Sequence, residues 1–341
     1  MNPNLEKRSS AHHCPLCEKM TTDILQEFNS EQAALHVSAN KPAEERLMLQ
    51  GHIENLWGNK NCSFLKCSNC GLSFASPFIS GDSFFYTNVY DNPVGYSSWK
   101  WEFEITRENI KNTILENSDR ELSLLEIGAG NGNFIKMLND DCYSSLDILT
   151  TEYSESGRQE IEKLGIKCVK KNLWDLSDDT NDNVFDFICM FQVLEHMEGI
   201  SKTFKSLSTL SNKGAYLFIA VPSDIHREYF EGLGYVEDVP PTHISRWSKE
   251  AFEYVGDKFG WSLVEHRREP NRLHTNVAKL LTFQFQDNLL IKKVNSVGNP
   301  TVRKILKLIL YTPLVVSIIP KILPLRDKNL GVVQWVMFKK Q

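Results

Sequence analysis

The stretch Leu122-Ser-Leu-Leu-Glu-Ile-Gly-Ala-Gly-Asn-Gly132 decides the fold of this 341-residue chain. A short apolar run leads into an acidic residue, Glu126, and then into three glycines at alternate positions, Gly128, Gly130 and Gly132. Because glycine has no Cβ, the backbone can turn tightly there and lie close to a ligand as the chain enters a helix. The pattern therefore predicts a buried strand, a ligand-binding turn and a helix.

Around this stretch, short apolar runs alternate with helical patterns over residues 121–270, which is typical of a parallel sheet covered on both faces. We expect strands over 122–127, 147–152, 166–170, 185–190, 215–221, 261–266 and 332–338. We expect helices over 42–57, 99–116, 133–139, 154–164, 200–210 and 249–259, the last with Ser248 as its N-cap. The longest apolar stretch, 308–320, is shorter than the roughly 20 residues that cross a bilayer, so no membrane span is predicted.

The spacing E-x-G-x-G-x-G resembles motif I of class I S-adenosylmethionine (SAM) methyltransferases and differs from the G-x-G-x-x-G of dinucleotide binders. SAM carries a sulfonium cation and no phosphate, so a carboxylate at the strand end suits it. The resemblance covers roughly residues 121–267 and the last strand. It implies an α/β, Rossmann-like, seven-stranded methyltransferase sheet, mostly parallel with an antiparallel last strand. It also implies that SAM lies against Glu126, Gly128, Ala129, Gly130 and Gly132.

The same resemblance implies further cofactor contacts at the ends of three more strands. They are Glu152 and Tyr153, Asn172 and Leu173, and Phe191 and Gln192. Glu152 has the position of the family carboxylate that accepts hydrogen bonds from both ribose hydroxyls of SAM. Asn172 replaces the family aspartate that contacts the adenine amino group, and Asp175 is the alternative for this contact. Phe191 and Gln192 would line the methionine end of SAM.

The candidate catalytic residues are Glu195, His196 and His243. Methyl transfer aligns a nucleophile with the sulfonium methyl carbon and often needs a base, and histidine titrates near neutrality. A Glu-His pair can equally brace its own loop, and for His243 both interpretations stay open. Tyr86 and Tyr90 could cap the site from the aromatic connector.

The run Gln192-Val-Leu-Glu195-His196, followed by His243, is similar to the E-x-x-E-H and later histidine with which small-RNA 2′-O-methyltransferases hold Mg²⁺. Gln192 replaces the first carboxylate, which removes a charge from a divalent site. Residues 1–80 hold seven basic and eight acidic residues, so they lack the positive surface expected of a nucleic-acid binder. An RNA methyltransferase and a catalytically silent SAM-binding scaffold stay as alternatives, and no nucleic-acid partner is favoured.

Two C-x-x-C pairs, Cys14 with Cys17 and Cys67 with Cys70, precede the methyltransferase pattern. Tetrahedral Zn²⁺ takes four such thiolates, and the eight cysteines without a secretion signal indicate a reducing compartment. We therefore expect structural Zn²⁺ in a ribbon-like domain, with a redox pair or unliganded thiols as the alternative. The less favoured ligands are Cys62, His12 and His13, and the cysteines expected in the core are Cys142, Cys168 and Cys189.

These patterns divide the chain into three parts: a zinc-ribbon-like domain with a helical insertion (1–80), an aromatic connector and helix (81–120), and the methyltransferase domain (121–341) with a basic amphipathic insertion at about 290–328. This layout, together with Pro240-Pro-Thr-His-Ile-Ser-Arg-Trp247, resembles bacterial methyltransferases of nucleotide-sugar or polysaccharide pathways. The resemblance implies O- or C-methylation of a small molecule or glycan precursor.

Net charge is distributed unevenly along the chain. Residues 291–341 hold ten Lys and Arg and one acidic residue, a balance of +9, so the total of −5 leaves −14 for the rest. The segment 299–326 could pack on the sheet edge, contact an anionic membrane surface or form a dimer interface. We expect a cytoplasmic protein for which peripheral contact with the inner face of the membrane is open. The acceptor atom and the oligomeric state are not predicted.

Overall fold

The computed structural model describes residues 12–21, 23–89, 98–116, 121–140, 146–178, 184–285, 293–294, 296–323 and 329–341. These residues belong to two compact units. Unit 1 comprises Met1–Asp224, Val236–Arg267 and Val333–Gln341, and unit 2 comprises Ile225–Tyr235 and Arg268–Val332.

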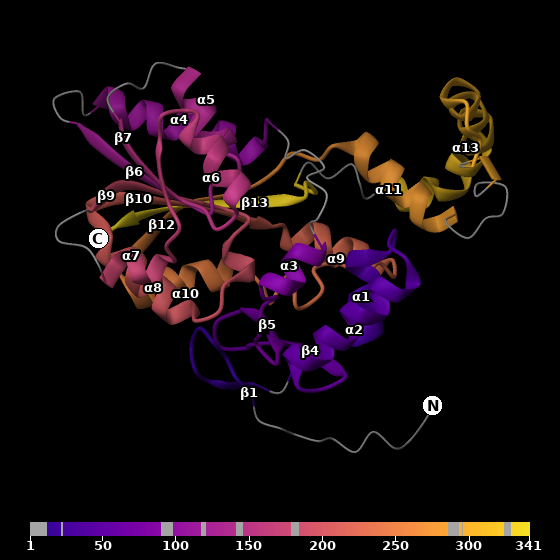
Figure 1. The fold of residues 1–341 in the computed structure, drawn as a ribbon, viewed down its shortest axis with the longest axis horizontal. Coiled ribbons are helices and arrows are strands. Elements are labelled where there is room, and N and C mark those ends of the chain that lie inside the picture. The colour runs from indigo at the N-terminus through magenta and orange to yellow at the C-terminus, as the bar shows by residue number, and fades with distance from the viewer. Residues whose placement is uncertain are drawn as a thin grey trace. The chain divides into compact units, whose positions relative to one another are not determined.

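Unit 1 is built on a seven-stranded sheet, as predicted (Figure 1). In spatial order its strands are β12 (Trp261–Arg268), β13 (Val333–Lys340), β10 (Ser211–Pro222), β9 (Phe185–Phe191), β6 (Leu122–Ile127), β7 (Leu146–Thr151) and β8 (Lys167–Val169). The pairs from β10 to β8 are parallel, whereas β13 runs antiparallel to β10. The predicted start of β10 at residue 215 was wrong, because the strand begins at Ser211 and shifts its register before Tyr216.

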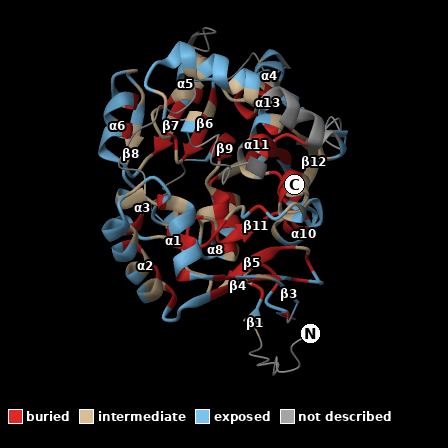
Figure 2. Cartoon of the chain, turned by 90° about the vertical axis from the view of Figure 1, so that its right-hand side faces the viewer, coloured by how far each residue is buried: buried red, intermediate tan, exposed pale blue. Residues whose placement is uncertain are grey.

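Helices cover both faces of this sheet, and the apolar side chains of β9 alternate between them. Phe187, Cys189 and Phe191 pack with α4 (Trp101–Glu116) and α5 (Asn133–Asp140). Ile188 and Met190 pack with the helices of the opposite face, α7 (Leu173–Asp178), α8 (Ile200–Thr209) and α10 (Lys249–Phe259). The central strands β6 and β9 are accordingly among the most buried parts of the fold, whereas the edge strands β8 and β12 are mostly intermediate or exposed (Figure 2). Burial on both faces explains why the strands read as continuous apolar runs.

The remaining helices of this sheet begin close to where the sequence predicts them. α6 (Glu155–Glu162) is capped by Ser154, whose Oγ accepts a hydrogen bond from the backbone N–H of Gly157. The predicted N-cap of α10 is confirmed, because Oγ of Ser248 accepts a hydrogen bond from the backbone N–H of Ala251. Such caps satisfy backbone donors that have no partner inside the helix.

The N-terminal part of unit 1 forms a second, four-stranded sheet of order β11-β5-β4-β3. Its strands are β3 (Ile24–Asn29), β4 (Asn61–Lys66), β5 (Ser73–Ser76) and β11 (Ser245–Arg246), and β1 (His12–His13) pairs separately with β2 (Met20–Thr21). The helices of this part are α1 (Ser30–Ser38), α2 (Ala43–Trp57) and α3 (Ser83–Val89). Strand β11 comes from the middle of the methyltransferase sequence and pairs antiparallel with β5.

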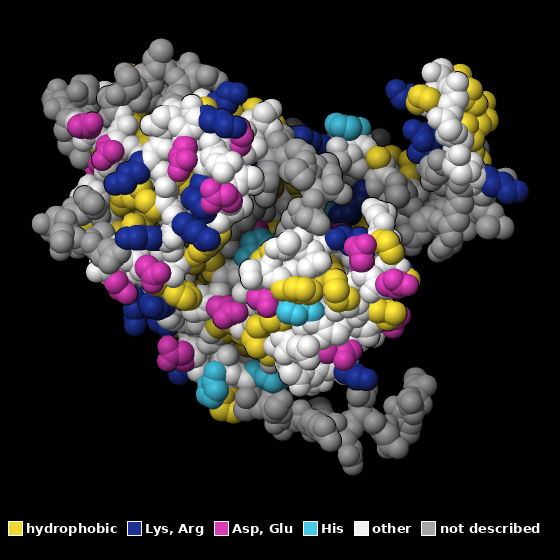
Figure 3. Space-filling view, viewed as in Figure 1, with side chains coloured by type: hydrophobic (Ala, Val, Ile, Leu, Met, Phe, Trp, Pro, Cys, Tyr) yellow, Lys and Arg dark blue, Asp and Glu magenta, His cyan; other side chains and the backbone are white. Residues whose placement is uncertain are grey.

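Unit 2 holds α11 (Leu273–Phe285), α13 (Pro300–Ile322) and most of α9 (Asp224–Gly232). Its core includes Phe230, Tyr235 and Leu280. Helix α13 begins at Pro300, continues through Pro313 and displays exposed apolar and basic side chains (Figure 3). Among the described residues, no helix is both long and apolar enough to cross a membrane.

Some predictions fall outside the described residues. They concern Tyr90, Cys142, and residues 290–292, 295 and 324–328 of the basic insertion.

Candidate functional site

The sequence motif around Glu126 lies at the carboxyl end of β6, where the order of strands reverses. The chain proceeds from β6 to β7 and β8 on one side and then returns to β9 on the other side of β6. In open α/β sheets, ligands bind at such a switch point, just beyond the carboxyl ends of the strands. The predicted ligand-binding turn therefore has the position that a cofactor requires.

The three motif glycines all have positive φ angles, 69° at Gly128, 58° at Gly130 and 74° at Gly132. A Cβ on Gly128 would lie 2.7 Å from Cγ2 of Val193, and one on Gly132 would lie 2.9 Å from Cγ1 of Ile161. A Cβ on Gly130 would meet nothing within 4 Å. Gly128 and Gly132 thus allow close packing of the turn, whereas Gly130 faces open space that a ligand can fill.

The carboxyl group of Glu126 is buried behind this turn, with an exposed fraction of 3%. Its Oε2 has no hydrogen-bond partner among the described residues. Burial raises the pKa of Glu126 to about 8, and the charge of Lys100 opposes this shift only in part. A cationic ligand would stabilise the ionised carboxylate here, so the donor set fits SAM.

Glu152 is held in place by the turn itself. Its Oε2 accepts a hydrogen bond from the backbone N–H of Gly130 (2.8 Å), and its Oε1 accepts one from the backbone N–H of Ser154 (2.7 Å). Ala129 is tied to the same strand end through its N–H, which donates to the backbone oxygen of Thr151. The next residue, Tyr153, is 62% exposed. A fixed carboxylate therefore lies beside Gly130, and an exposed ring follows it in the chain.

The predicted adenine contact is divided between two side chains. Oδ1 of Asn172 accepts a hydrogen bond from the backbone N–H of Asp175 (2.8 Å), and its Nδ2 donates to Oδ2 of Asp175 (2.7 Å). Asn172 thus acts as a cap for α7, while the exposed Asp175 keeps one carboxylate oxygen outside this pair of bonds. Leu173 is buried in the core beneath the sheet, so its side chain is a packing group.

The two residues at the end of β9 differ in character. The ring of Phe191 packs against Phe134 (4.9 Å between centroids) and Phe103 (5.0 Å), so its side chain belongs to the core. Gln192 has a φ of 58°, which is uncommon for a residue with a Cβ. Its buried Nε2 has no hydrogen-bond partner among the described residues. Gln192 therefore brings a polar group with unused hydrogen-bonding capacity to the switch point.

The three candidate catalytic residues meet next to this position. One ligand-type atom from each of Glu195, His196 and His243 lies within 4.8 Å of the others. The two imidazole rings are 4.7 Å apart between centroids, and Nε2 of His196 lies 3.9 Å from Oε1 of Glu195. Because Val193 packs against Gly128, this cluster lies beside the motif turn.

The environment separates the proton affinities within the cluster. Burial raises the pKa of Glu195 to about 7 and lowers the pKa of His196 to about 3. Burial also opposes protonation of His243, but the hydrogen bond and charge of Asp238 outweigh it and raise the pKa of His243. Groups whose pKa values are pushed apart in this way are typical of acid-base sites.

Sequence reasoning missed two residues that orient these histidines. Oδ1 of Asp238 lies 2.8 Å from Nδ1 of His243, and the backbone oxygen of Thr242 lies 2.5 Å from Nδ1 of His196. Tyr86, which the sequence suggested as a cap, places its hydroxyl 3.2 Å from the same Nδ1 of His196. The signal for Asp238 was an acidic residue shortly before Pro240-Pro241, but a carboxylate before a turn has many uses.

Backbone pairing brings His243 to the cluster. The N–H of Ile244 donates to the backbone oxygen of Glu195, and the N–H of Ala75 in β5 donates to the backbone oxygen of Ile244. The segment that begins β11 is therefore fixed on one side by the methyltransferase loop and on the other by the N-terminal sheet.

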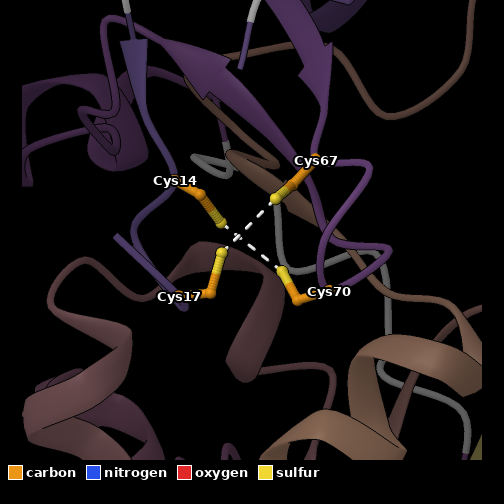
Figure 4. A group of neighbouring side chains, drawn as sticks. All are labelled: Cys14, Cys17, Cys67 and Cys70. Atoms are coloured by element: carbon orange, nitrogen blue, oxygen red, sulfur yellow. Dashed lines mark hydrogen bonds between the residues drawn. The ribbon is translucent and has the colours of Figure 1, made fainter. Parts of the chain in front are cut away.

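The four predicted metal ligands also converge (Figure 4). The Sγ atoms of Cys14, Cys17, Cys67 and Cys70 lie within 4.8 Å of one another, and all four side chains are buried. The Sγ atoms of Cys14 and Cys70 are 3.5 Å apart, and those of Cys17 and Cys67 are 3.4 Å apart. A tetrahedron with Zn–S bonds of about 2.3 Å has S···S edges of about 3.8 Å, so the cluster is compatible with zinc.

The two C-x-x-C turns have the same backbone hydrogen bonds. The N–H of Cys14 donates to the oxygen of Lys19 and that of Glu18 to the oxygen of Cys14, and in the second turn Cys67, Leu72 and Gly71 repeat the pattern. The residue that closes each turn has a positive φ, 63° at Glu18 and 75° at Gly71. Cys62, His12 and His13 are not part of the cluster.

The cysteine cluster packs against the methyltransferase core. Its residues share one hydrophobic core with Phe252 and Val255 of α10. Nζ of Lys258 donates a hydrogen bond to the backbone oxygen of Leu16 (2.6 Å), and Oγ of Ser248 donates to that of Gly71 (3.3 Å). The first and second cysteine pairs are thus attached to the two ends of the same helix.

Comparisons with known proteins agree with this geometry. Residues 99–266 match a family described as a methyltransferase domain. No curated protein matches the sequence significantly.

Among solved structures, the chain is similar to a sarcosine dimethylglycine methyltransferase described as putative, from Galdieria sulphuraria (14% identity, 71% of this chain and 91% of that chain, TM-score 0.43). It is also similar to a SAM-dependent methyltransferase from Archaeoglobus fulgidus (14% identity, 70% and 94%, TM-score 0.44). A third is magnesium protoporphyrin IX methyltransferase from Synechocystis PCC 6803 with bound SAH (10% identity, 72% and 90%, TM-score 0.41). The family match spans residues 99–266, which are 168 of the 341 residues, and together with the glycine turn at the switch point it identifies this part of the chain as a methyltransferase domain.

Proposed function

We propose that this enzyme transfers a methyl group from SAM to an oxygen or carbon of a small polar molecule such as a glycan precursor. The observation that carries the proposal is the meeting of two groups at one switch point. A glycine turn backed by Glu126 lies beside the cluster of Glu195, His196 and His243, and Val193, two residues before Glu195, packs against the turn. The first group suits a cationic cofactor, and the second suits activation of an acceptor.

On the cofactor side, each strand end has its own task. The carboxylate of Glu152 would accept hydrogen bonds from the ribose hydroxyls, since two backbone N–H groups already orient it. Asp175 would accept a hydrogen bond from the adenine amino group, because Asn172 already caps α7. Glu126 would face the positively charged methionine end of SAM, which supplies the methyl group. Gly130 leaves room for the ligand.

On the acceptor side, His243 is the best-placed base. Its Nδ1 is bound to Asp238, which fixes the ring and leaves Nε2 available for a proton. His196 is oriented through Thr242 in the same way, and burial keeps it neutral. Alignment of the acceptor with the methyl carbon and removal of its proton are the two requirements that this arrangement meets.

The polar lining of the site supports a hydroxyl-rich acceptor. Three side chains in this region carry buried polar atoms without a hydrogen-bond partner among the described residues, namely Gln192 (Nε2), Glu195 (both oxygens) and Thr242 (Oγ1). Buried polar atoms without partners cost free energy, so a ligand that supplies several hydroxyl groups would be favoured over an apolar one.

Loss of SAM binding on filling the space at Gly130 tests the cofactor site. Asn tolerates positive φ better than most residues, so Gly130→Asn fills space with little backbone strain. Gly58→Asn is the matched control, because Gly58 has a φ of 62° and also meets nothing within 4 Å. Calorimetry should show SAM binding to the wild type and the control and a strong loss in Gly130→Asn. Equal affinities in all three proteins would contradict the assigned pocket.

We further propose that the four cysteines hold one structural Zn²⁺ that fixes the N-terminal residues to α10. Metal analysis should find about one Zn per chain in the wild type and a loss in Cys67→Ser, because four thiolates make a closed tetrahedral site. Cys62→Ser is the control, since Cys62 is buried in β4 outside the cluster. Unchanged zinc in Cys67→Ser would refute this site.

A further inference from the structure

We infer that Glu195, His196 and His243 form a binding site for one divalent transition-metal ion. The inference rests on the proposed function and deepens it: with Nε2 of His243 bound as a ligand, the ion would take over from His243 the activation of the acceptor hydroxyl, whose pKa it would lower. It starts from the donor set, in which two imidazoles and one carboxylate bring their ligand atoms within 4.8 Å of one another. Two histidines and one carboxylate with open positions are a known arrangement for such ions.

The outer contacts of both histidines are those of metal ligands. A histidine that binds a metal usually donates its other ring N–H to a carboxylate or a backbone carbonyl. Here Nδ1 of His243 lies 2.8 Å from Oδ1 of Asp238, and Nδ1 of His196 lies 2.5 Å from the backbone oxygen of Thr242. Both rings therefore keep Nε2 for a ligand, and both ring orientations are fixed from behind.

The third donor is the carboxylate of Glu195, whose charge a bound cation would compensate. Glu195 is 1% exposed, and neither of its carboxylate oxygens has a hydrogen-bond partner among the described residues. An ionised carboxylate that is buried without a partner is strongly disfavoured, and metal coordination is one of the few ways to stabilise it.

Closure of the site around an ion requires only small movements. Metal–ligand bonds of about 2.1 Å place neighbouring donor atoms roughly 3.0–3.4 Å apart. Nε2 of His196 and Oε1 of Glu195 are 3.9 Å apart. Among the described residues no other residue forms a hydrogen bond with the Glu195 carboxylate, so rotation of its side chain can supply most of the remaining shift.

The donor set selects the class of metal. Imidazole nitrogen suits Zn²⁺, Fe²⁺, Co²⁺ and Ni²⁺, whereas Mg²⁺ demands oxygen ligands. The site therefore differs from an oxygen-rich magnesium site, and excess Mg²⁺ should not compete for it.

The test is a titration of purified, zinc-containing protein with Co²⁺ by calorimetry, followed by desalting and metal analysis. The expected result is one cobalt per chain beside unchanged zinc, with binding retained in excess Mg²⁺. Glu195→Gln should lower the Co²⁺ affinity roughly 100-fold or more, because it removes a ligand that bears charge. His52→Asn is the control, because His52 forms an exposed pair with Asp82 (2.8 Å) and belongs to no three-ligand group among the described residues.

Two results would overturn the inference: no cobalt beyond that which replaces zinc, or equal Co²⁺ affinity in Glu195→Gln and the wild type. SAM calorimetry on the same proteins verifies that Glu195→Gln remains folded. It also separates the two proposals, since a wild type that takes up cobalt but not SAM keeps the metal site and loses the proposed function. A protein that binds SAM but not cobalt keeps the function and loses the metal site.

Discussion

Replacement of Glu126 by Gln should remove most of the pH dependence of SAM binding. In the free enzyme, burial raises the pKa of Glu126 to about 8, so at pH 7 its carboxyl group is roughly 90% protonated. A cationic ligand favours the ionised form, and binding at pH 7 should therefore release about 0.9 proton.

The size of the effect follows from the ionised fraction. Between pH 6 and pH 8 this fraction rises from about 1% to about 50%, so SAM affinity should increase about 50-fold, or roughly 2.3 kcal/mol, and then level off above pH 8. Calorimetry in two buffers of different ionisation enthalpy measures the released proton directly. The Gln variant should show a much smaller slope, which is the part that comes from the ligand's own amino group.

The same shift has a consequence for folding. A carboxyl group whose pKa is higher in the folded than in the unfolded state stabilises the fold only while it is protonated. Stability is therefore lost as pH rises from the unfolded pKa of about 4.3 toward 8, and Glu126→Gln should reduce this loss.

The binding experiment decides the role of Glu126. An identical dependence of SAM affinity on pH in the wild type and Glu126→Gln would refute the assignment of Glu126 to the cationic end of SAM.

Two further predictions concern the cysteine turns and the histidine pair. Gly71→Ala should lower the free energy of unfolding by about 2 kcal/mol, because φ is 75° at this position and the new Cβ would lie 2.9 Å from Oγ of Ser248. Glu18 has the matching position in the first turn, with a φ of 63°. Glu18→Gly should therefore raise the free energy of unfolding by about 0.5–1 kcal/mol, and thermal unfolding measures both changes. A loss in both variants would contradict the similarity of the two turns. Asp238→Asn should reduce kcat by roughly 100-fold without loss of SAM affinity, because Asp238 is hydrogen-bonded to His243 on the acceptor side of the site; unchanged kcat would contradict a role of this bond in the reaction.

The sheet was predictable because its signals are local. The run from Leu122 to Ile127 is mostly apolar and buried on both faces, and the glycines that follow it have positive φ angles, so strand and turn can be inferred from a few neighbouring residues. The convergence of the two cysteine pairs was predictable for a similar reason, because each C-x-x-C turn forms within its own few residues and only the pairing of the turns is long-range.

Other parts of the site depend on contacts that the sequence does not reveal. The use of Asn172 as a helix cap follows from the start of α7, and the burial of Phe191 follows from the packing of Phe103 and Phe134 against it. The bond between Asp238 and His243 depends on how the chain turns before β11. Two-residue strands such as β11 carry almost no periodicity, so their pairing is decided by the tertiary structure.

The antiparallel pairing of β11 with β5 also limits where this enzyme can be recombined with others. A chimaera with its breakpoint near residue 98 would replace Ala75 and Phe74 while it retains Ile244 and Ser245, and the hybrid ladder would have to form between strands of different parents. The loop that carries His243 would then inherit any mismatch. A chimaera of this enzyme should therefore take β5 and β11 from the same parent.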